Sequence, residues 1–279
     1  DTPTPDVVKK AQEYYNSDDA DRFYFQIWGG EDIHIGLYET PTEAISPASQ
    51  RTVVRMAEQL PDDFGAQSRL LDIGAGYGGA ARYLARRFDC EVTALNLSEV
   101  QNDRDREFNK EAGLDHKIEV IDGNFEHLPL PDASYDVVWC QDSILHSARR
   151  KRVFEEVDRV LKPGGHFVFT DPMQADDADP KRLQPVYDRI HLDSLGSVET
   201  YRGYARDLGW EEVGWDDRSH QLPNHYRRVH ETLSAERENL DDTISDAYIE
   251  RMLQGLEHWV KAGNDGLLKW GILHFKKPE

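Results

Sequence analysis

A run of apolar residues followed by closely spaced glycines does most to limit the fold of this chain. The stretch Leu70–Ile73 is apolar apart from Asp72, and glycines follow at positions 74, 76, 78 and 79. A helical pattern then begins at Gly79 and continues to Phe88. This order predicts a buried strand, a tight turn and a helix N-terminus, where the backbone can come very close to a ligand.

The chain after residue 69 alternates between strand and helix patterns. Helices are expected near 79–88, 98–112, 149–161 and 198–208, and strands at 69–73, 91–95, 118–121, 135–140, 166–170, 210–215 and 268–275. A turn is expected at 162–165, where the sequence reads Lys-Pro-Gly-Gly. The alternation predicts an α/β fold, with a Rossmann-like seven-stranded, mostly parallel sheet and helices on both faces. Ligands bind such sheets beyond the carboxyl ends of the strands.

Three segments fall outside this alternation. Residues 1–60 have a helical, aromatic pattern, which predicts an N-terminal helical cap on a main domain formed by residues 61–279. Two further segments interrupt the main domain at about 173–197 and 219–265, the second as two helices of mixed charge. Their positions predict a lid that covers the ends of the strands.

The charge balance excludes some classes of partner. Lys and Arg number 33, Asp and Glu number 53, and the formal net charge is −20. Nucleic acids and acidic membrane surfaces both attract basic proteins, so neither is an expected partner. The acidic residues are spread along the chain and Arg is favoured over Lys, which indicates adaptation to high salt, where screening relieves self-repulsion. An ordinary acidic cytosolic protein is the alternative.

Cysteines and the hydropathy pattern indicate the compartment. The two cysteines, Cys90 and Cys140, flank predicted strands and are expected to be buried in a reducing environment. Neither a signal peptide nor a run of about 18 apolar residues is present, so a soluble cytoplasmic protein is expected. The acidic run 176–179 lacks the rest of a calcium-loop pattern, and no His/Cys spacing suits zinc. No metal is expected.

The Asp72-Ile-Gly-Ala-Gly sequence resembles motif I of the class I methyltransferases that depend on S-adenosylmethionine (SAM). The resemblance implies that SAM is the cofactor and that Gly74, Ala75 and Gly76 approach its methionine end. Asp72 would orient the loop or help to hold the ammonium group. A glycine-rich turn of this kind also occurs in NAD-binding folds, so the other motifs must distinguish the two.

The end of the second predicted strand departs from both of these folds. They usually place an acidic residue there to accept hydrogen bonds from the ribose hydroxyls, whereas this chain has Asn96, followed by Leu97. An amide can accept one hydrogen bond and donate another, so Asn96 can still hold the ribose. Ser98 is a suitable N-cap for the next helix, and Gln101, one turn into that helix, is expected to face the same pocket.

The ends of the third and fourth strands supply further candidates. In SAM-dependent methyltransferases the loop after the third strand holds adenine, and Asn124 and Phe125 match it by position, although Asn124 could equally be a turn residue. After the fourth strand, Gln141, Asp142 and His146 emerge where the sulfonium would lie. His146 is the candidate to orient or deprotonate an amine, because histidine changes charge near neutral pH. A purely structural histidine is the alternative.

A closer resemblance covers nearly the whole chain. The chain is similar to the sarcosine/dimethylglycine N-methyltransferases, which make glycine betaine, and that family is similar to it at Asn96. Phosphoethanolamine, sterol and cyclopropane-forming methyltransferases share the core motifs but match the lid less well. The segments that carry the resemblance are 28–38, 95–96, 100–102, 141–147, 170–173, 255–259 and 270–271.

This resemblance implies a small zwitterionic amino acid as the methyl acceptor. Its carboxylate must be held, and Arg202 is the first choice because a guanidinium binds a carboxylate through two parallel hydrogen bonds. Arg202 could also be an ordinary surface arginine, and His225 and Tyr226 are the alternatives.

Aromatic residues are candidates to flank the methylated nitrogen. Tyr24, Trp28 and Trp270 could do so, since aromatic faces attract quaternary ammonium groups. Packing in the core is the alternative for each of them. Met173, in the shared segment 170–173, is the remaining candidate for acceptor contact.

Three rival functions stay open at this point. A C- or O-methyltransferase acting on a lipid or polyketide would need an apolar tunnel, whereas this lid is polar. A SAM-binding protein without catalysis would release no S-adenosylhomocysteine (SAH), and a dehydrogenase would bind NADH. A monomer is expected. The sequence leaves open whether glycine is accepted and how many methyl groups are transferred before the product leaves.

Overall fold

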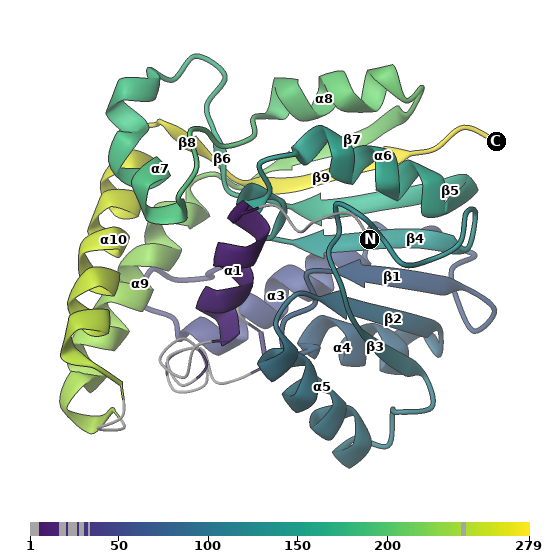
Figure 1. Ribbon diagram of the computed structural model, residues 1–279, viewed down its shortest axis with the longest axis horizontal. Coiled ribbons are helices and arrows are strands. Elements are labelled where there is room, and N and C mark those ends of the chain that lie inside the picture. The colour runs from purple at the N-terminus through teal and green to yellow at the C-terminus, as the bar shows by residue number, and fades with distance from the viewer. Residues whose placement is uncertain (1–5, 17–20, 22–26, 28–30, 33, 241–243) are drawn as a thin grey trace.

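The computed structural model describes residues 6–16, 21, 27, 31–32, 34–240 and 244–279. Its main sheet has seven strands in the order β3-β2-β1-β4-β5-β9-β7, and all neighbours pair in parallel except β9, which is antiparallel to β5 and β7 (Figure 1). The predicted α/β fold is confirmed. The strands are β1 (Arg69–Ile73), β2 (Glu91–Asn96), β3 (Ile118–Asp122), β4 (Tyr135–Gln141), β5 (Leu161–Thr170), β7 (Glu211–Asp217) and β9 (Gly271–Lys276).

The helices begin and end within two residues of their expected positions wherever a single helix was predicted. Ser98 caps the helix that follows β2, because its side chain accepts a hydrogen bond from the backbone N–H of Gln101 at 3.2 Å. The longer helices are α1 (Asp6–Asn16), α3 (Ile45–Ala57), α4 (Gly79–Phe88), α5 (Glu99–Glu111), α6 (Arg150–Val160), α7 (Gln184–Ile190), α8 (Val198–Asp207), α9 (Gln221–Glu236) and α10 (Asp246–Asn264).

Helices cover both faces of the sheet because successive strand residues point to opposite sides. Leu71 in β1 belongs to a core cluster with α6 and α8, in which the rings of Phe154 and Tyr201 stack at 5.3 Å. Its neighbour Leu70 belongs to a second cluster, with α3 and α4. The helix α3 packs directly on the sheet. Among the described helices of the first 60 residues, α1 alone contributes to neither of these two core clusters. The division into a cap and a main domain at residue 60 stays a prediction.

The turn expected at 162–165 lies inside β5. Leu161 pairs with Tyr135 and His166 pairs with Val137, so four residues of β5 bulge out between two consecutive pairings. The single strand expected at 268–275 is also interrupted. Its first part, β8 (Leu268–Lys269), pairs with β6 (Met173–Gln174) in a separate two-stranded sheet.

The segments outside the alternation gather beyond the carboxyl ends of the parallel strands. There α9 and α10 stand side by side, α7 packs against α10, and α1 crosses between them and the sheet (Figure 1). The segment 173–197, expected to be a polar insertion, contains β6, a short 3-10 helix η2 (Pro180–Leu183) and α7. That these elements cover the ends of the strands as a lid stays a prediction.

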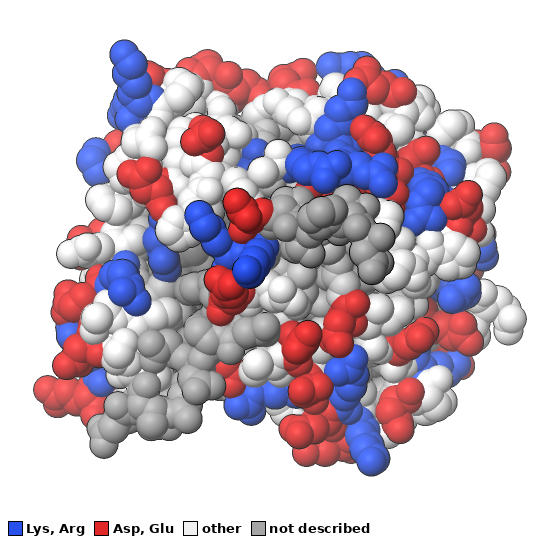
Figure 2. All heavy atoms as spheres, viewed as in Figure 1, with Lys and Arg blue, Asp and Glu red and all other residues white. Residues whose placement is uncertain are grey.

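Acidic and basic side chains are interspersed over the face shown in Figure 2, without a separate acidic region. Both cysteines are buried thiols, as predicted. None of the described helices is both long and apolar enough to cross a membrane. Within the described ranges, no group of three or more His, Cys, Asp or Glu side chains is placed to hold a metal ion.

Candidate functional site

The glycine loop after β1 depends on backbone conformations that side chains disfavour. Gly74, Gly76 and Gly78 have φ angles of 77°, 56° and 82°, in the left-handed region. The N–H groups of Gly74 and Ala75 both donate to the carbonyl of Leu95, at 2.8 and 3.1 Å. The loop is therefore fixed against the end of β2. A Cβ on Gly74 would lie 2.3 Å from Oγ of Ser143, so this position has no room for a side chain.

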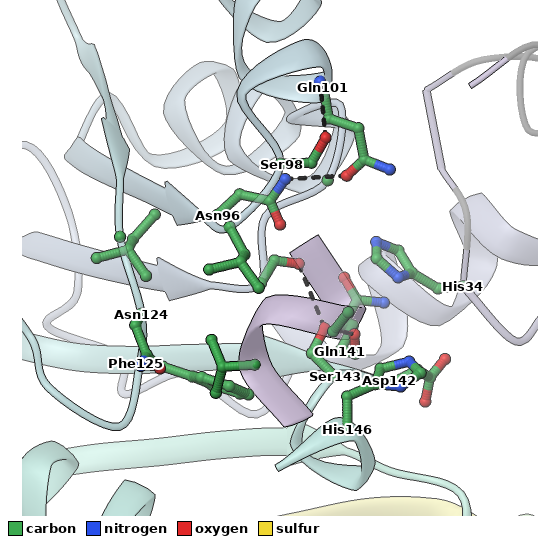
Figure 3. Close-up of a pocket in the computed structure, with 17 residues that line it drawn as sticks. His34, Asn96, Ser98, Gln101, Asn124, Phe125, Gln141, Asp142, Ser143 and His146 are labelled. Atoms are coloured by element: carbon green, nitrogen blue, oxygen red, sulfur yellow. Dashed lines mark hydrogen bonds between the residues drawn. The ribbon is translucent and has the colours of Figure 1, made fainter. Parts of the chain in front are cut away.

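A cavity opens beside this loop, and we call it the loop cavity (Figure 3). Its wall comes from the carboxyl ends of four neighbouring parallel strands, β3, β2, β1 and β4, and from Val8 and Ala11 of α1. The residues that line it are Val8, Ala11, His34, Gly74, Gly76, Leu95, Asn96, Leu97, Ser98, Gln101, Gly123, Asn124, Phe125, Gln141, Asp142, Ser143 and His146.

Two glutamines present hydrogen-bond donors at this cavity. Asn96 donates its amide hydrogen to Oε1 of Gln101 at 2.9 Å, and Trp139 donates its indole N–H to Oε1 of Gln141 at 3.1 Å. With each carbonyl oxygen held in this way, Nε2 of each glutamine is buried without an acceptor among the described residues. A buried donor without an acceptor is costly. Both groups therefore suit a ligand rich in acceptor oxygens.

Asn124 and Phe125 lie at the opposite end of the loop cavity (Figure 3). Oδ1 of Asn124 accepts a hydrogen bond from the backbone N–H of Glu126 at 2.9 Å, a side-chain turn of the kind typical for asparagine. Phe125 is half-buried against the core. Asn124 thus forms the turn and lines the cavity as well.

A second cavity of about 490 Å³ lies between α1 and the helices α7, α9 and α10, and we call it the lid cavity after the predicted lid. Ala11, Asp142 and His146 line both cavities and so form the boundary between them. The lid cavity is lined by Val7, Lys10, Ala11, Glu13, Ile35, Asp142, Leu145, His146, Pro172, Arg189, Ile190, His191, His225, Tyr226, Met252, Gly255, Leu256 and Trp259.

Asp142 is held at this boundary in an uncommon conformation. Its φ is 52°, a left-handed value that costs a non-glycine residue energy and is often found at functional sites. Its carboxylate accepts hydrogen bonds from the backbone N–H of Ile35 and the indole N–H of Trp270, both at 2.8 Å. Burial raises the pKa of this carboxyl group. These two hydrogen bonds hold the carboxylate in place at the boundary of the cavities.

His146 follows one turn later, in the short 3-10 helix η1 (Ile144–His146). Burial, and then the positive charges of Arg150 and Arg189, lower the pKa of His146 to about 4. The imidazole is therefore neutral at physiological pH. One ring nitrogen can accept a hydrogen bond from a ligand amine or a water, but the imidazole does not hold a second proton at that pH.

Comparison with known proteins places this site in a family. A methyltransferase domain model matches residues 71–169. The sarcosine/dimethylglycine N-methyltransferase of Halorhodospira halochloris is 55% identical over 97% of this chain and 97% of its own length. The dimethylglycine N-methyltransferase of Parasynechococcus marenigrum is 50% identical, over 96% and 95% of the two chains. The chain belongs to the sarcosine/dimethylglycine N-methyltransferase family.

A solved structure agrees with this assignment. The crystal structure of a protein assigned as a sarcosine dimethylglycine methyltransferase in Galdieria sulphuraria superposes with a TM-score of 0.91 at 43% identity, and covers 95% of this chain and 99% of that one. The present protein is thus a methyltransferase whose methyl donor is SAM. The predicted family and cofactor are confirmed.

Most of the predicted cofactor-binding residues line the loop cavity. Gly74, Gly76, Asn96, Leu97, Gln101, Asn124, Phe125 and Gln141 all line the loop cavity, and His146 lines both cavities. Asp72 and Ala75 do not line either one. Asp72 is buried within β1 between Ala94 and Trp139, and burial, with the nearby Asp105, raises its pKa well above the usual value. Direct contact of these two side chains with SAM is therefore not supported, whereas a role in shaping the loop stays a prediction.

The prediction for Arg202 needs correction. Its guanidinium binds Glu199 at 2.8 Å and Glu212 at 2.6 Å, on the outer side of α8, and it lines neither cavity. These two carboxylates raise its pKa, Glu212 most. Arg202 was predicted because it follows the lid segment in the sequence. Its charge is already neutralised by Glu199 in the same helix and by Glu212 in β7. Met173 is also misplaced, because it is wholly buried in β6 within the core.

The other acceptor candidates divide into three groups. His225 and Tyr226 line the lid cavity, where the acceptor is proposed to bind. Burial lowers the pKa of His225 to about 3, and its Nδ1 lies 2.7 Å from the hydroxyl of Tyr38, so it is a neutral partner. Trp270 is buried, lines neither cavity, and donates its indole N–H to Asp142 at their boundary. Tyr24 and Trp28 lie outside the described residues.

Sequence reasoning missed two parts of the site. The first is α1, whose Val8 and Ala11 line the loop cavity. The spacing of small apolar residues on one face of this helix indicates a buried face, but it does not indicate which part of the protein that face contacts. The second is Arg189 in α7, which lines the lid cavity. Nothing near Arg189 in the sequence separates it from the other arginines of the polar insertion.

Proposed function

We propose that this methyltransferase transfers the methyl group of SAM to the nitrogen of sarcosine, dimethylglycine or both, and so forms glycine betaine. SAM would occupy the loop cavity and the amino acid the lid cavity. The observation that carries the proposal is the boundary shared by the two cavities at Ala11, Asp142 and His146. Methyl transfer requires the sulfonium carbon and the amine to meet in line, and this boundary is where two ligands in these cavities would touch.

The loop cavity fits SAM by the chemistry of its donors. The buried Nε2 groups of Gln101 and Gln141 need acceptors, and SAM offers ribose hydroxyls and a carboxylate. Asn96 donates a hydrogen bond to Gln101, lines the same cavity, and would contact the ribose. Phe125 and Asn124, at the other end, would flank adenine. The glycine loop would admit the methionine end, because Gly74 and Gly76 line the cavity without side chains.

The residues of the boundary have limited chemistry to perform. Bound SAM supplies a methyl group that is already strongly electrophilic, so the protein must align the amine, exclude water and admit the amine in its neutral form. Neutral His146 would orient the amine lone pair or an ordered water by a hydrogen bond. With a pKa of about 4 it does not keep the ammonium proton, which passes to solvent before transfer. The Asp142 carboxyl group would face the positive charge that develops on nitrogen.

The physiological role follows from the product. Glycine betaine balances osmotic pressure, and the dispersed acidic surface, with a net charge of −20, suits a protein that works in high salt. We further propose a cytoplasmic monomer. Size-exclusion chromatography with light scattering tests the oligomeric state.

Turnover assays test the proposal directly. The protein would be incubated with SAM and, separately, glycine, sarcosine, dimethylglycine or phosphoethanolamine, at low and high salt, with products identified by mass spectrometry. Betaine and SAH are expected from dimethylglycine, and dimethylglycine or betaine from sarcosine. SAH formation with phosphoethanolamine alone, or SAM binding without SAH from any amino acid, would overturn the proposal.

A further inference from the structure

Arg189 is a cation that lines the lid cavity, and it forms no ion pair with the carboxylates of the described residues. It lies in the last turn of α7 and is half-buried. Its guanidinium contacts the sulfur of Met252, and among the described residues no carboxylate pairs with it. By contrast, Arg182 pairs with Asp265 at 3.4 Å, and Arg202 pairs with two carboxylates. A half-buried guanidinium without a carboxylate is a suitable receptor for an anionic ligand.

The helix α10 leaves room for the Arg189 side chain. Gly255, in the middle of α10, faces it, and a Cβ at that position would lie 2.5 Å from Nε and 2.7 Å from Cδ of Arg189. Glycine inside a helix is normally unfavourable. Its presence here leaves a passage through which the arginine reaches the cavity. Two lid helices thus combine to hold one guanidinium in place.

Arg189 also lines the same cavity as His146, which lies at the boundary between the two cavities. Its charge is one of the two that lower the pKa of His146, so the guanidinium acts on the boundary between the cavities. The other cation that lines the lid cavity, Lys10, is exposed on α1 and offers only a point charge. The aromatic rings of Tyr226 and Trp259, 5.1 Å apart, line the same cavity.

We propose that Arg189 binds the carboxylate of the amino-acid acceptor through two parallel hydrogen bonds, and that Gly255 is required to place it. This inference rests on the proposed function. It makes Arg189 the residue that selects amino acids over amines without a carboxylate. The planar guanidinium would set the distance and direction of the amine relative to His146, because sarcosine and dimethylglycine have only one carbon between carboxylate and nitrogen.

The test compares two acceptors that differ only in the carboxylate. Kinetic constants would be measured for dimethylglycine and for N,N-dimethylethanolamine with wild type, Arg189→Gln, Arg189→Lys and Gly255→Ala. We expect Arg189→Gln to lower kcat/KM for dimethylglycine about 10- to 100-fold, the range for a hydrogen bond to a charged group. Its activity on dimethylethanolamine and its SAM affinity, measured by calorimetry, should change less than about threefold. Arg189→Lys should recover part of the loss, and Gly255→Ala should resemble Arg189→Gln.

Three controls separate the outcomes. Arg182→Gln lies in the same lid segment but pairs outward, and Gly203→Ala places a Cβ that contacts only Arg206, at 3.9 Å; both should behave as wild type. Lys10→Ala tests the other cation of the cavity. Suppose that wild type converts dimethylglycine. If Arg189→Gln then has the wild-type KM for dimethylglycine, or loses activity equally on both acceptors, the role of Arg189 is refuted and the proposed function stands. If wild type converts no amino acid, the proposed function itself fails.

Discussion

The glycine loop allows a quantitative test of how tertiary contacts hold the SAM site. Gly78 has a φ of 82°, and a Cβ on it would lie 2.0 Å from Oδ1 of Asp105 in α5. That carboxylate is wholly buried and binds Nη1 of Arg82 at 3.1 Å. Arg82 in turn donates to the carbonyl of Tyr77 in the loop at 2.7 Å. The methyl group of Gly78→Ala would therefore disturb the buried contacts that brace the loop.

Two costs add in this variant. A left-handed conformation costs an alanine about 1–2 kcal/mol, and a buried polar group that loses its partner costs about 1–3 kcal/mol. Gly78→Ala should therefore lower the free energy of unfolding by about 2–5 kcal/mol. Gly113 offers a matched control, because its φ is 69° and a Cβ there would meet nothing within 4 Å. Gly113→Ala should show only the conformational cost of about 1–2 kcal/mol.

Urea unfolding, followed by circular dichroism, measures both variants, and calorimetry measures their SAM affinity. Gly78→Ala should also weaken SAM binding, whereas Gly113→Ala should not. A double-mutant cycle with Asp105→Ala should give a coupling of about 1–3 kcal/mol, since the clash disappears with the carboxylate. Equal destabilisation by the two glycine variants, or no coupling in the cycle, would refute this account of the loop.

Other predictions concern the boundary and the effect of acid. His146→Ala should lower kcat about 10- to 100-fold through misplacement of the amine, with SAM affinity nearly intact, and unchanged turnover would make His146 structural. Ala11→Phe would place a large ring at the wall that both cavities share, so the KM for the acceptor and the Kd for SAM should both rise; a change in only one would contradict the shared boundary. For His274, burial and then the nearby His166 lower the pKa to about 4, below the unfolded value of 6.5. As the pH falls, the unfolded chain binds a proton at His274 before the folded chain does. The free energy of unfolding is therefore unaffected by this group above pH 6.5 and decreases as the pH falls toward 4. From pH 7 to pH 4 wild type should lose about 3 kcal/mol more stability than His274→Gln in urea titrations, and parallel curves would show that His274 is not shifted.

Local sequence determined most of the fold. The strands and helices from 69 to 160 form where periodicity, Ser98 and the glycines predict them, because a parallel sheet with crossover helices needs nearly continuous apolar strands and marked turns. The turn expected at 162–165 is the exception, because it became a bulge within β5. The cofactor side could be foreseen for the same reason. Asn96, Asn124 and Gln141 lie at strand ends, and parallel strands bring their carboxyl ends to one edge of the sheet.

The acceptor side was decided by packing between distant segments. Arg202 and Arg189 are both arginines near the lid, and no local pattern distinguishes them. The fold does so by placing Glu199 and Glu212 beside Arg202, and a glycine of α10 beside Arg189. The sequence by itself thus determined the sheet, the glycine loop and the family, because these depend on neighbours along the chain. Only the tertiary structure decided which cation remains available to a ligand, because a charge is neutralised by whatever lies next to it in space.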